Sequence, residues 1–205
     1  MDKGYHKTVG GIRGHILRRF IHLSMLIIPF LYYSYAKSRF NFFGLSSKFL
    51  LLVIIGLMLL FEIVRLKRWW LLWGQREREG KNISSLAWTI VSLCLVLLLA
   101  PGKQYAMPIV WSCAIVDPLL GELRRTQLSR TWIVFIGIVV VMFIWGLASW
   151  WFKIDWLLAL LMGPLVIILE WPNFRWVDDN ALVQLVPLLV ILILYGQSES
   201  GGFSC

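Results

Sequence analysis

Long apolar runs separated by short charged segments most constrain the fold of this 205-residue chain. A helix needs about 20 predominantly apolar residues to cross a bilayer. Seven runs approach this length, at residues 20–36, 49–64, 82–101, 104–116, 131–152, 156–169 and 181–197. Hydrophobic residues make up 59% of the chain and charged ones 15%, against roughly 45–50% and 25% in soluble domains. The sequence therefore excludes an ordinary soluble globular domain.

The runs predict helices and not strands. They lack the polar–apolar alternation of a membrane barrel, and a helix satisfies its own backbone hydrogen bonds. We expect an all-α integral membrane protein, a bundle of about seven transmembrane helices in one domain over residues 1–197, followed by a flexible tail at 198–205. The second, fourth and sixth runs are short, so one of them could be re-entrant or extend past its charged ends. Residues 65–73, basic and rich in Trp, predict a short interfacial helix.

Lys and Arg are distributed unevenly over the connecting segments. With a cytoplasmic N-terminus, the inner segments hold fifteen Lys and Arg and the outer segments hold five. This asymmetry follows the positive-inside rule and predicts an outer C-terminus. Nine of the eleven acidic residues also fall on the inner side, which that rule does not require. Topology and lipid headgroups account for the net charge of +9, so we expect no nucleic-acid partner.

Several acidic residues lie near the inner ends of the runs, where ionisable groups that face a bundle interior often mark sites. Four of them could converge on a divalent cation and a polyphosphate: Asp117, Glu170, Asp178 and Asp179. Three arginines after Asp117 could neutralise the phosphate charge by forked hydrogen bonds: Arg124, Arg125 and Arg130. The open alternative is a set of ordinary solvated loops of mixed charge.

Two pairs with helical spacing form further candidates. Arg18 and His22 are four residues apart and share one face of a helix that enters the membrane; the alternative is that they anchor the chain at the headgroups. Glu62 and Arg65 are three residues apart, which permits an ion pair. Such a pair contributes only about 0.2–0.5 kcal/mol when exposed, so a structural role is its default interpretation.

Taken in order, five short segments carry a family resemblance. Residues 18–22 (RRFIH) resemble R-[RK]-x-x-H, residues 62–65 (EIVR) resemble E-x-x-R, and residues 76–80 (REREG) resemble R-E-x-E or R-E-G. Residues 116–121 (VDPLLG) resemble D-P-x-A or G-D-x-x-A, and EWP at 170–172 with VDDN at 177–180 and Pro187 resembles E-x-x-P…D-D-N…P. This order is similar to that of the integral-membrane CTP-dependent lipid kinases: dolichol kinase, phytol kinase and CTP-dependent diacylglycerol kinase.

The resemblance implies phosphorylation of a membrane lipid alcohol of the polyprenol (dolichol), phytol or diacylglycerol type. It implies CTP as phosphate donor, Mg²⁺ as cofactor, and a location in the bacterial cytoplasmic (inner) membrane. The implied catalytic residues are Asp117, Asp178 and Asp179, with Asp117 and Asp179 as metal ligands. The implied contacts to phosphate or substrate are Arg18, His22, Arg65, Arg124, Arg130, Asn180 and Glu170.

A second hypothesis comes from a different class of protein. Leu120 and Arg124 stand where the family has Ala and Gly, and residues 132–134 (WIV) replace its acidic and glycine positions. These departures favour a catalytically inactive relative that acts as a lipid-binding or structural subunit beside other membrane subunits. A small transporter is less favoured, because the ionisable residues gather at one face and not near the bilayer midplane.

Overall fold

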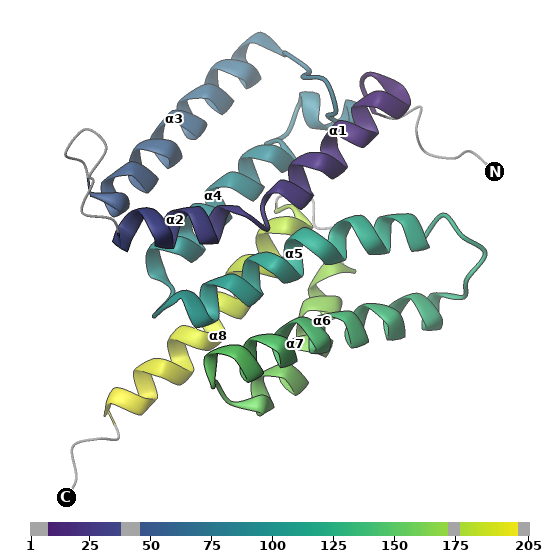
Figure 1. Ribbon diagram of the computed structural model, residues 1–205. Coiled ribbons are helices and arrows are strands. Elements are labelled where there is room, and N and C mark those ends of the chain that lie inside the picture. Colours follow the sequence, from purple (N-terminus) through teal and green to yellow (C-terminus); the bar gives the residue numbers. More distant parts are fainter. Residues whose placement is uncertain (1–7, 38–45, 172–176, 201–205) are drawn as a thin grey trace, which may run out of the picture.

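A computed structural model of the chain describes residues 8–37, 46–171 and 177–200. Over these residues the secondary structure is helical, apart from one isolated antiparallel bridge between Thr8 and Arg76. The α-helices (Figure 1) are α1 (Gly11–Ser24), α2 (Ile28–Lys37), α3 (Ser47–Arg68), α4 (Ser85–Leu99), α5 (Lys103–Leu123), α6 (Arg130–Phe152), α7 (Trp156–Glu170) and α8 (Asp179–Ser200), with a short 3₁₀ helix η3 (Glu77–Gly80).

The predicted all-α class is confirmed over the described residues. Four helical stretches are long and apolar enough to cross a membrane: Gly11–Tyr35, Ser47–Arg68, Lys103–Leu123 and Arg130–Phe152. Three shorter apolar helices accompany them: Ser85–Leu99, Trp156–Glu170 and Asp179–Tyr195. Each predicted run therefore corresponds to one helix, except the first, which is divided between α1 and α2.

The first run is interrupted after Ser24 for a local reason. The backbone N–H groups of Met25, Leu26 and Ile27 donate to carbonyls three residues earlier, at 3.1 Å each, which tightens the chain into a 3₁₀-like turn. Pro29, in the first turn of α2, has no N–H with which to continue the ladder. The helix direction changes at this point (Figure 1).

The predicted interfacial helix at residues 65–73 is wrong. Helix α3 continues to Arg68 and ends at Trp69, which adopts a left-handed conformation with φ 57°. The backbone beyond it bonds to other parts of the chain, because Gly74 N–H donates to Val9 O at 2.9 Å and Val9 N–H donates to Gln75 O at 2.9 Å. These contacts replace the internal bonds that a helix would need.

Two further boundaries differ from those expected. Helix α5 extends to Leu123, well past the charged end of the run at 104–116, so Asp117 and Glu122 lie on the helix and not in a loop. Helix α8 continues to Ser200, three residues into the predicted tail; residues 201–205 lie outside the described residues.

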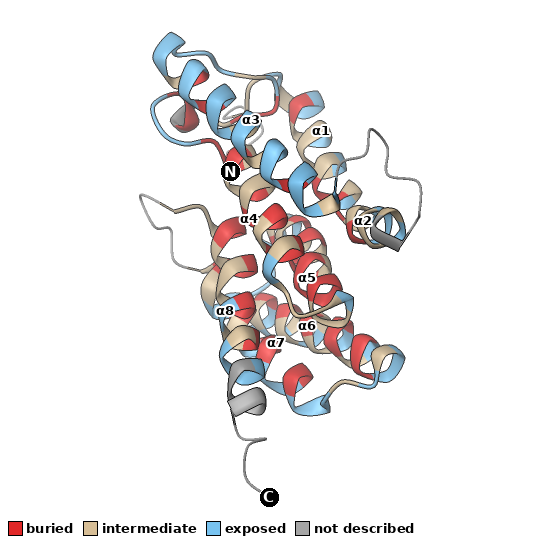
Figure 2. Ribbon diagram, turned by 90° about the vertical axis from the view of Figure 1, so that its left-hand side faces the viewer, coloured by how far each residue is buried: buried red, intermediate tan, exposed pale blue. Residues whose placement is uncertain are grey.

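Helices α4, α5, α6, α7 and α8 enclose the main core. Trp145, Val141 and Met162 are fully buried there, and Gly163 lets α7 approach α6, because a Cβ at this position would lie 3.2 Å from the Ile138 carbonyl oxygen. The outward faces are also apolar, with Phe143 64% and Ile168 66% exposed. Figure 2 shows the same exposure along α3. Apolar outer faces of this extent suit a lipid environment.

A buried ion pair fixes the connection between α3 and α4. The Arg65 side chain is 0% exposed and donates from Nε and Nη2 to the two carboxylate oxygens of Glu62, at 2.9 and 2.7 Å. Its guanidinium also donates to the backbone carbonyls of Trp70, Glu79 and Asn82. Glu62 in turn accepts from the backbone N–H and the hydroxyl of Ser84. The pair therefore holds together residues from four parts of the connection.

We expect Glu62→Gln to lower the free energy of unfolding by about 3–5 kcal/mol, because it leaves the buried Arg65 guanidinium without its counter-ion. Reversible unfolding in detergent, followed by circular dichroism, measures the change. Lys67→Gln on the same helix is the control, since Lys67 is exposed and its loss should change stability by no more than about 0.5 kcal/mol. Equal stability of the two variants would contradict the assigned role.

Candidate functional site

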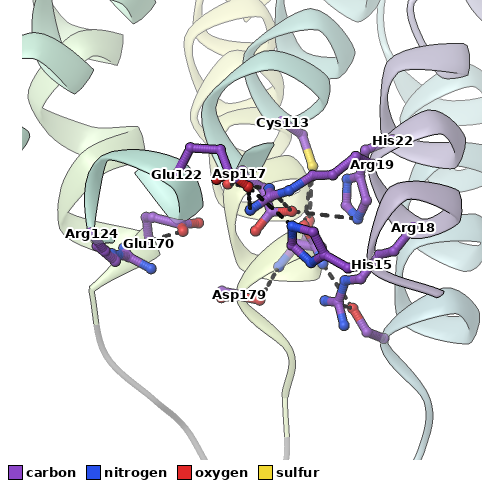
Figure 3. A network of polar contacts seen from close by, with 12 residues as sticks. His15, Arg18, Arg19, His22, Cys113, Asp117, Glu122, Arg124, Glu170 and Asp179 are labelled. Atoms are coloured by element: carbon purple, nitrogen blue, oxygen red, sulfur yellow. Dashed lines mark hydrogen bonds and ion pairs between the residues drawn. The ribbon is translucent and has the colours of Figure 1, made fainter. Parts of the chain in front are cut away.

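Three carboxylates from three helices meet at one end of the bundle. Asp117 of α5, Glu170 at the end of α7 and Asp179 at the start of α8 each offer one oxygen, and these oxygens all lie within 4.8 Å of one another. Figure 3 shows the three side chains in place. We call this group the carboxylate cluster. The expected meeting of Asp117 and Asp179 is thus present, and Glu170 joins them.

The carboxylate cluster fits a divalent cation by the chemistry of its donors. All three are hard anionic oxygens, which Mg²⁺ and Ca²⁺ prefer, while Mg²⁺ typically combines one or two protein carboxylates with water or phosphate oxygens. Glu170 is only 4% exposed, so its negative charge needs compensation from nearby cations. The cluster therefore combines suitable ligands with closely spaced carboxylates whose charged forms a bound cation would stabilise.

Arginines surround the carboxylate cluster. Arg124 donates to Glu170 at 3.3 Å, and the guanidinium groups of Arg124 and Arg130 both lie over the Trp171 ring, 5.1 and 4.4 Å from its centroid. Cations stack favourably on an aromatic face. The single ring therefore holds two positive charges next to Glu170.

Arg19 supports Asp117 from α1. It donates to the backbone carbonyl of Asp117 at 3.0 Å and lies 3.8 Å from its carboxylate. The contact depends on Gly121, because a Cβ there would collide with the Arg19 guanidinium. Arg19 belongs to the segment 18–22 that carries the resemblance, but it was not among the residues expected to contact phosphate or substrate.

The start of α8 is held by a polar network around Asp178. The Asp178 carboxylate accepts from Asn180 Nδ2 at 2.7 Å, from the Asn180 backbone N–H at 3.2 Å and from the Ser85 hydroxyl at 3.1 Å. Burial raises the pKa of Asp178, but hydrogen bonds and the nearby Arg18 charge outweigh burial and hold this pKa below its ordinary value. Asp178 is therefore a charged acceptor that orders the chain beside Asp179, and it is not one of the three clustered carboxylates.

Arg18 and His22 face the same region, as their spacing predicts. Arg18 pairs with Glu79 at 3.3 Å and donates to the Ser85 hydroxyl at 3.0 Å. His22 is 4% exposed, and its Nε2 lies 3.5 Å from Asp117 Oδ2. Both residues therefore border the site from α1, and His22 reaches the carboxylate cluster itself.

Arg65 is not part of the site around the carboxylate cluster. Its Nε, Nη1 and Nη2 all donate to Glu62 or to backbone carbonyls, and its side chain is fully buried. No donor faces a position that a phosphate could reach, so the predicted phosphate contact by Arg65 is replaced by a structural role. Arg125, one of the three arginines expected after Asp117 to neutralise phosphate charge, lies against Glu122 and His15.

Comparisons of the chain with protein-family models, with curated proteins and with solved structures find no significant match. The chemistry of the site therefore has to be argued from the residues that the fold brings together.

We expect the carboxylate cluster to bind Mn²⁺, used as a paramagnetic substitute for Mg²⁺, in the purified protein without nucleotide. Asp179→Asn should weaken Mn²⁺ affinity by at least the roughly 10–100-fold that loss of a supporting residue costs a metal site. Electron paramagnetic resonance of free Mn²⁺ measures the affinity. Glu122→Gln, which removes a different carboxylate from the same end of the molecule, should leave it unchanged; equal losses in both variants would show only a general effect of charge.

Proposed function

We propose that this chain is an integral membrane phosphotransferase that transfers the terminal phosphoryl group of CTP to the hydroxyl of a membrane lipid. The observation that carries the proposal is the carboxylate cluster beside two arginines, at one end of a bundle of apolar helices. Phosphoryl transfer requires little covalent chemistry from a protein beyond positioning and charge neutralisation. The choice of CTP over other nucleotides rests on the family resemblance alone.

Each residue of the site has a role in this reaction. Asp117, Glu170 and Asp179 would hold Mg²⁺, which when bound neutralises phosphate charge. Arg124 and Arg130 supply forked donors to phosphate oxygens. Asp178 and Asn180 fix the backbone that carries Asp179, through the hydrogen bonds at the start of α8. The hydroxyl oxygen of the lipid attacks the terminal phosphorus, the bond from this phosphorus to its bridging oxygen breaks, and the nucleoside diphosphate leaves. The hydroxyl proton passes to the Asp117 carboxylate.

The pair of arginines on Trp171 supports an anionic ligand. Two like charges on one ring repel each other, and the contact of Arg124 with Glu170 compensates only one of them. A polyphosphate between the two guanidinium groups removes this repulsion. The Arg124 side chain is 39% exposed, whereas the Glu170 side chain, taken without its backbone, is only 1% exposed. The arginine is therefore the partner that is free to turn toward a ligand.

One observation favours the alternative of a catalytically inactive lipid-binding or structural subunit. Arg124 stands where the resembling family has glycine, and its contact with Glu170 occupies one of the three clustered carboxylates. In an inactive protein this ion pair takes the place of the metal permanently. The activity of the purified protein decides between the two functions.

The direct test is transfer of radiolabel from [γ-³²P]CTP or ATP to a panel of lipid alcohols by protein in nanodiscs. Asp117→Asn should reduce the rate by about 10²–10³-fold, the range for loss of one electrostatic contact to a transition state. Asp155→Asn is the matched control, because Asp155 caps α7 at its opposite end and Asn caps a helix equally well. Absence of transfer by the wild type with every nucleotide would replace the kinase by the subunit hypothesis.

We also propose that the chain crosses the bacterial cytoplasmic membrane seven times, with its N-terminus inside and its C-terminus outside. The argument for this topology is that the inner segments hold fifteen Lys and Arg and the outer segments hold five. The position of the start of α1 and the end of α8 on opposite sides of the bundle supports an odd number of spans (Figure 1). In this topology the carboxylate cluster faces the cytoplasm, where nucleotide is available.

Reporter fusions test this topology in living cells. Alkaline phosphatase fused after Lys103 should be active, because the segment before α5 is outside, whereas the same reporter fused after Arg125 should be inactive. A cytoplasmic reporter at the two positions gives the reverse pattern. Identical readings at both positions would mean that α5 does not cross the membrane.

A further inference from the structure

A cavity of about 80 Å³ lies between α1, the segment 72–75 and the start of α4. Five of its lining side chains are apolar: Leu17, Ile21, Leu72, Trp73 and Leu86. Sites that enclose a whole small molecule have volumes of roughly 300–1,000 Å³. This cavity therefore suits a small group, or the end of a longer molecule whose remainder lies elsewhere.

Three buried polar side chains that line this cavity have atoms without a hydrogen-bond partner among the described residues. The atoms are His22 Nδ1, Gln75 Nε2 and Thr89 Oγ1, on side chains that are 3–5% exposed. Gln75 is held by its other end, because its Oε1 accepts from the Leu72 N–H at 2.9 Å. Buried polar atoms are nearly always hydrogen-bonded, so three of them around one cavity indicate a polar ligand.

The charges that border the cavity are already neutralised. Arg18 and Glu79 pair at 3.3 Å, and Glu79 also accepts from the Ser85 backbone N–H. A phosphate or carboxylate there finds no unpaired counter-ion. The unpartnered atoms instead combine an amide donor, a hydroxyl that donates and accepts, and an imidazole nitrogen, which together match a hydroxyl group.

Exposed apolar side chains lie at the cavity or next in sequence to residues that line it, since Ile16 precedes Leu17 and Phe20 precedes Ile21. Trp73 lines it and is 54% exposed, and Phe20 and Ile16 on α1 are 68% and 59% exposed. We infer that the cavity binds the hydroxyl end of an uncharged, single-hydroxyl membrane alcohol whose chain lies against these apolar side chains. That this alcohol is the phosphoryl acceptor rests on the proposed function.

His22 connects the cavity to the carboxylate cluster. His22 lines the cavity and its buried Nδ1 has no hydrogen-bond partner among the described residues, while its Nε2 lies 3.5 Å from Asp117 Oδ2. One side chain therefore belongs both to the cavity lining and to the surroundings of Asp117. The confined space favours a primary alcohol on a single chain over diacylglycerol, whose hydroxyl is flanked by two ester-linked chains.

Photolabelling tests the cavity without nucleotide or metal. A hexadecanol analogue with a diazirine near the hydroxyl should label residues 17–22 and 72–89 of the full-length protein in nanodiscs, as mapped by mass spectrometry. Unlabelled hexadecanol should compete, whereas its methyl ether and hexadecyl phosphate should compete poorly. Thr89→Val, which keeps the side-chain volume and removes the hydroxyl, should weaken labelling about three- to tenfold, equivalent to one hydrogen bond.

Ser112→Ala is the matched control. Ser112 Oγ is likewise buried and unpartnered, but it is in α5 and is not among the residues that line the cavity. Its loss should leave labelling unchanged. Gln75→Glu is a second variant, because it keeps the acceptor for Leu72 N–H, removes both amide donors and adds a charge; it should reduce labelling further.

The outcomes separate the cavity from the proposed reaction. Labelling in the cavity without any phosphoryl transfer would overturn the kinase and retain the alcohol site. Transfer to alcohols with labelling elsewhere, or with equal labelling of wild type and Thr89→Val, would overturn the alcohol site and retain the kinase. Equal competition by the methyl ether would also overturn it, since the hydroxyl would then not be recognised.

Discussion

One buried guanidinium organises the part of the molecule that borders the cavity. Arg65 donates to both oxygens of Glu62 and to carbonyls of Trp70, Glu79 and Asn82. Because these carbonyls are spread over thirteen residues of the connection between α3 and α4, a single side chain determines its path. A buried charge is tolerable only when its donors are satisfied, so the connection and the ion pair stabilise each other.

The path of this connection determines two neighbouring features. It places Gln75 on the wall of the cavity and Glu79 opposite Arg18. It also delivers Ser85 to the first turn of α4, where the hydroxyl of Ser85 donates to Asp178 at 3.1 Å. The structural pair on α3 therefore influences the start of α8, although it contacts no residue of the carboxylate cluster.

Charge balance explains why the carboxylate cluster persists at one end of the bundle. Three carboxylates this close repel one another. Asp179 lies in the first turn of α8, where the positive end of the helix dipole favours an anion, while Arg19 and Arg124 approach Asp117 and Glu170. These partners offset part of the repulsion.

Sequence periodicity predicted the helices and part of the site for identifiable reasons. Apolar runs of this length predict helices directly. Asp117 and Asp179 were expected to lie close together because both are near ends of runs that were assigned to the cytoplasmic side. The interruption after Ser24 was missed because its one sequence signal, Pro29, is a residue that membrane helices tolerate. The burial of Arg65 was missed because three of its acceptors are backbone carbonyls. Every residue has a backbone carbonyl, so the sequence does not show which ones Arg65 contacts. Gln75 and Thr89 are ordinary polar residues until folding leaves their atoms unpartnered around one cavity.

Arg124 stands where the resembling family has glycine, and the structure gives this residue a physical role. A glycine at this position could not contact Glu170, whereas Arg124 both neutralises this buried carboxylate and stacks on Trp171. Stacking leaves the edge of the guanidinium available for hydrogen bonds, since a cation over a ring uses its face. Exchange of Glu170 for a phosphate oxygen therefore needs only a rotation of an exposed side chain over a fixed aromatic surface. In the proposed function, the same exchange would leave Glu170 free to bind the cation together with Asp117 and Asp179, so that arrival of the anion and binding of the cation would favour each other.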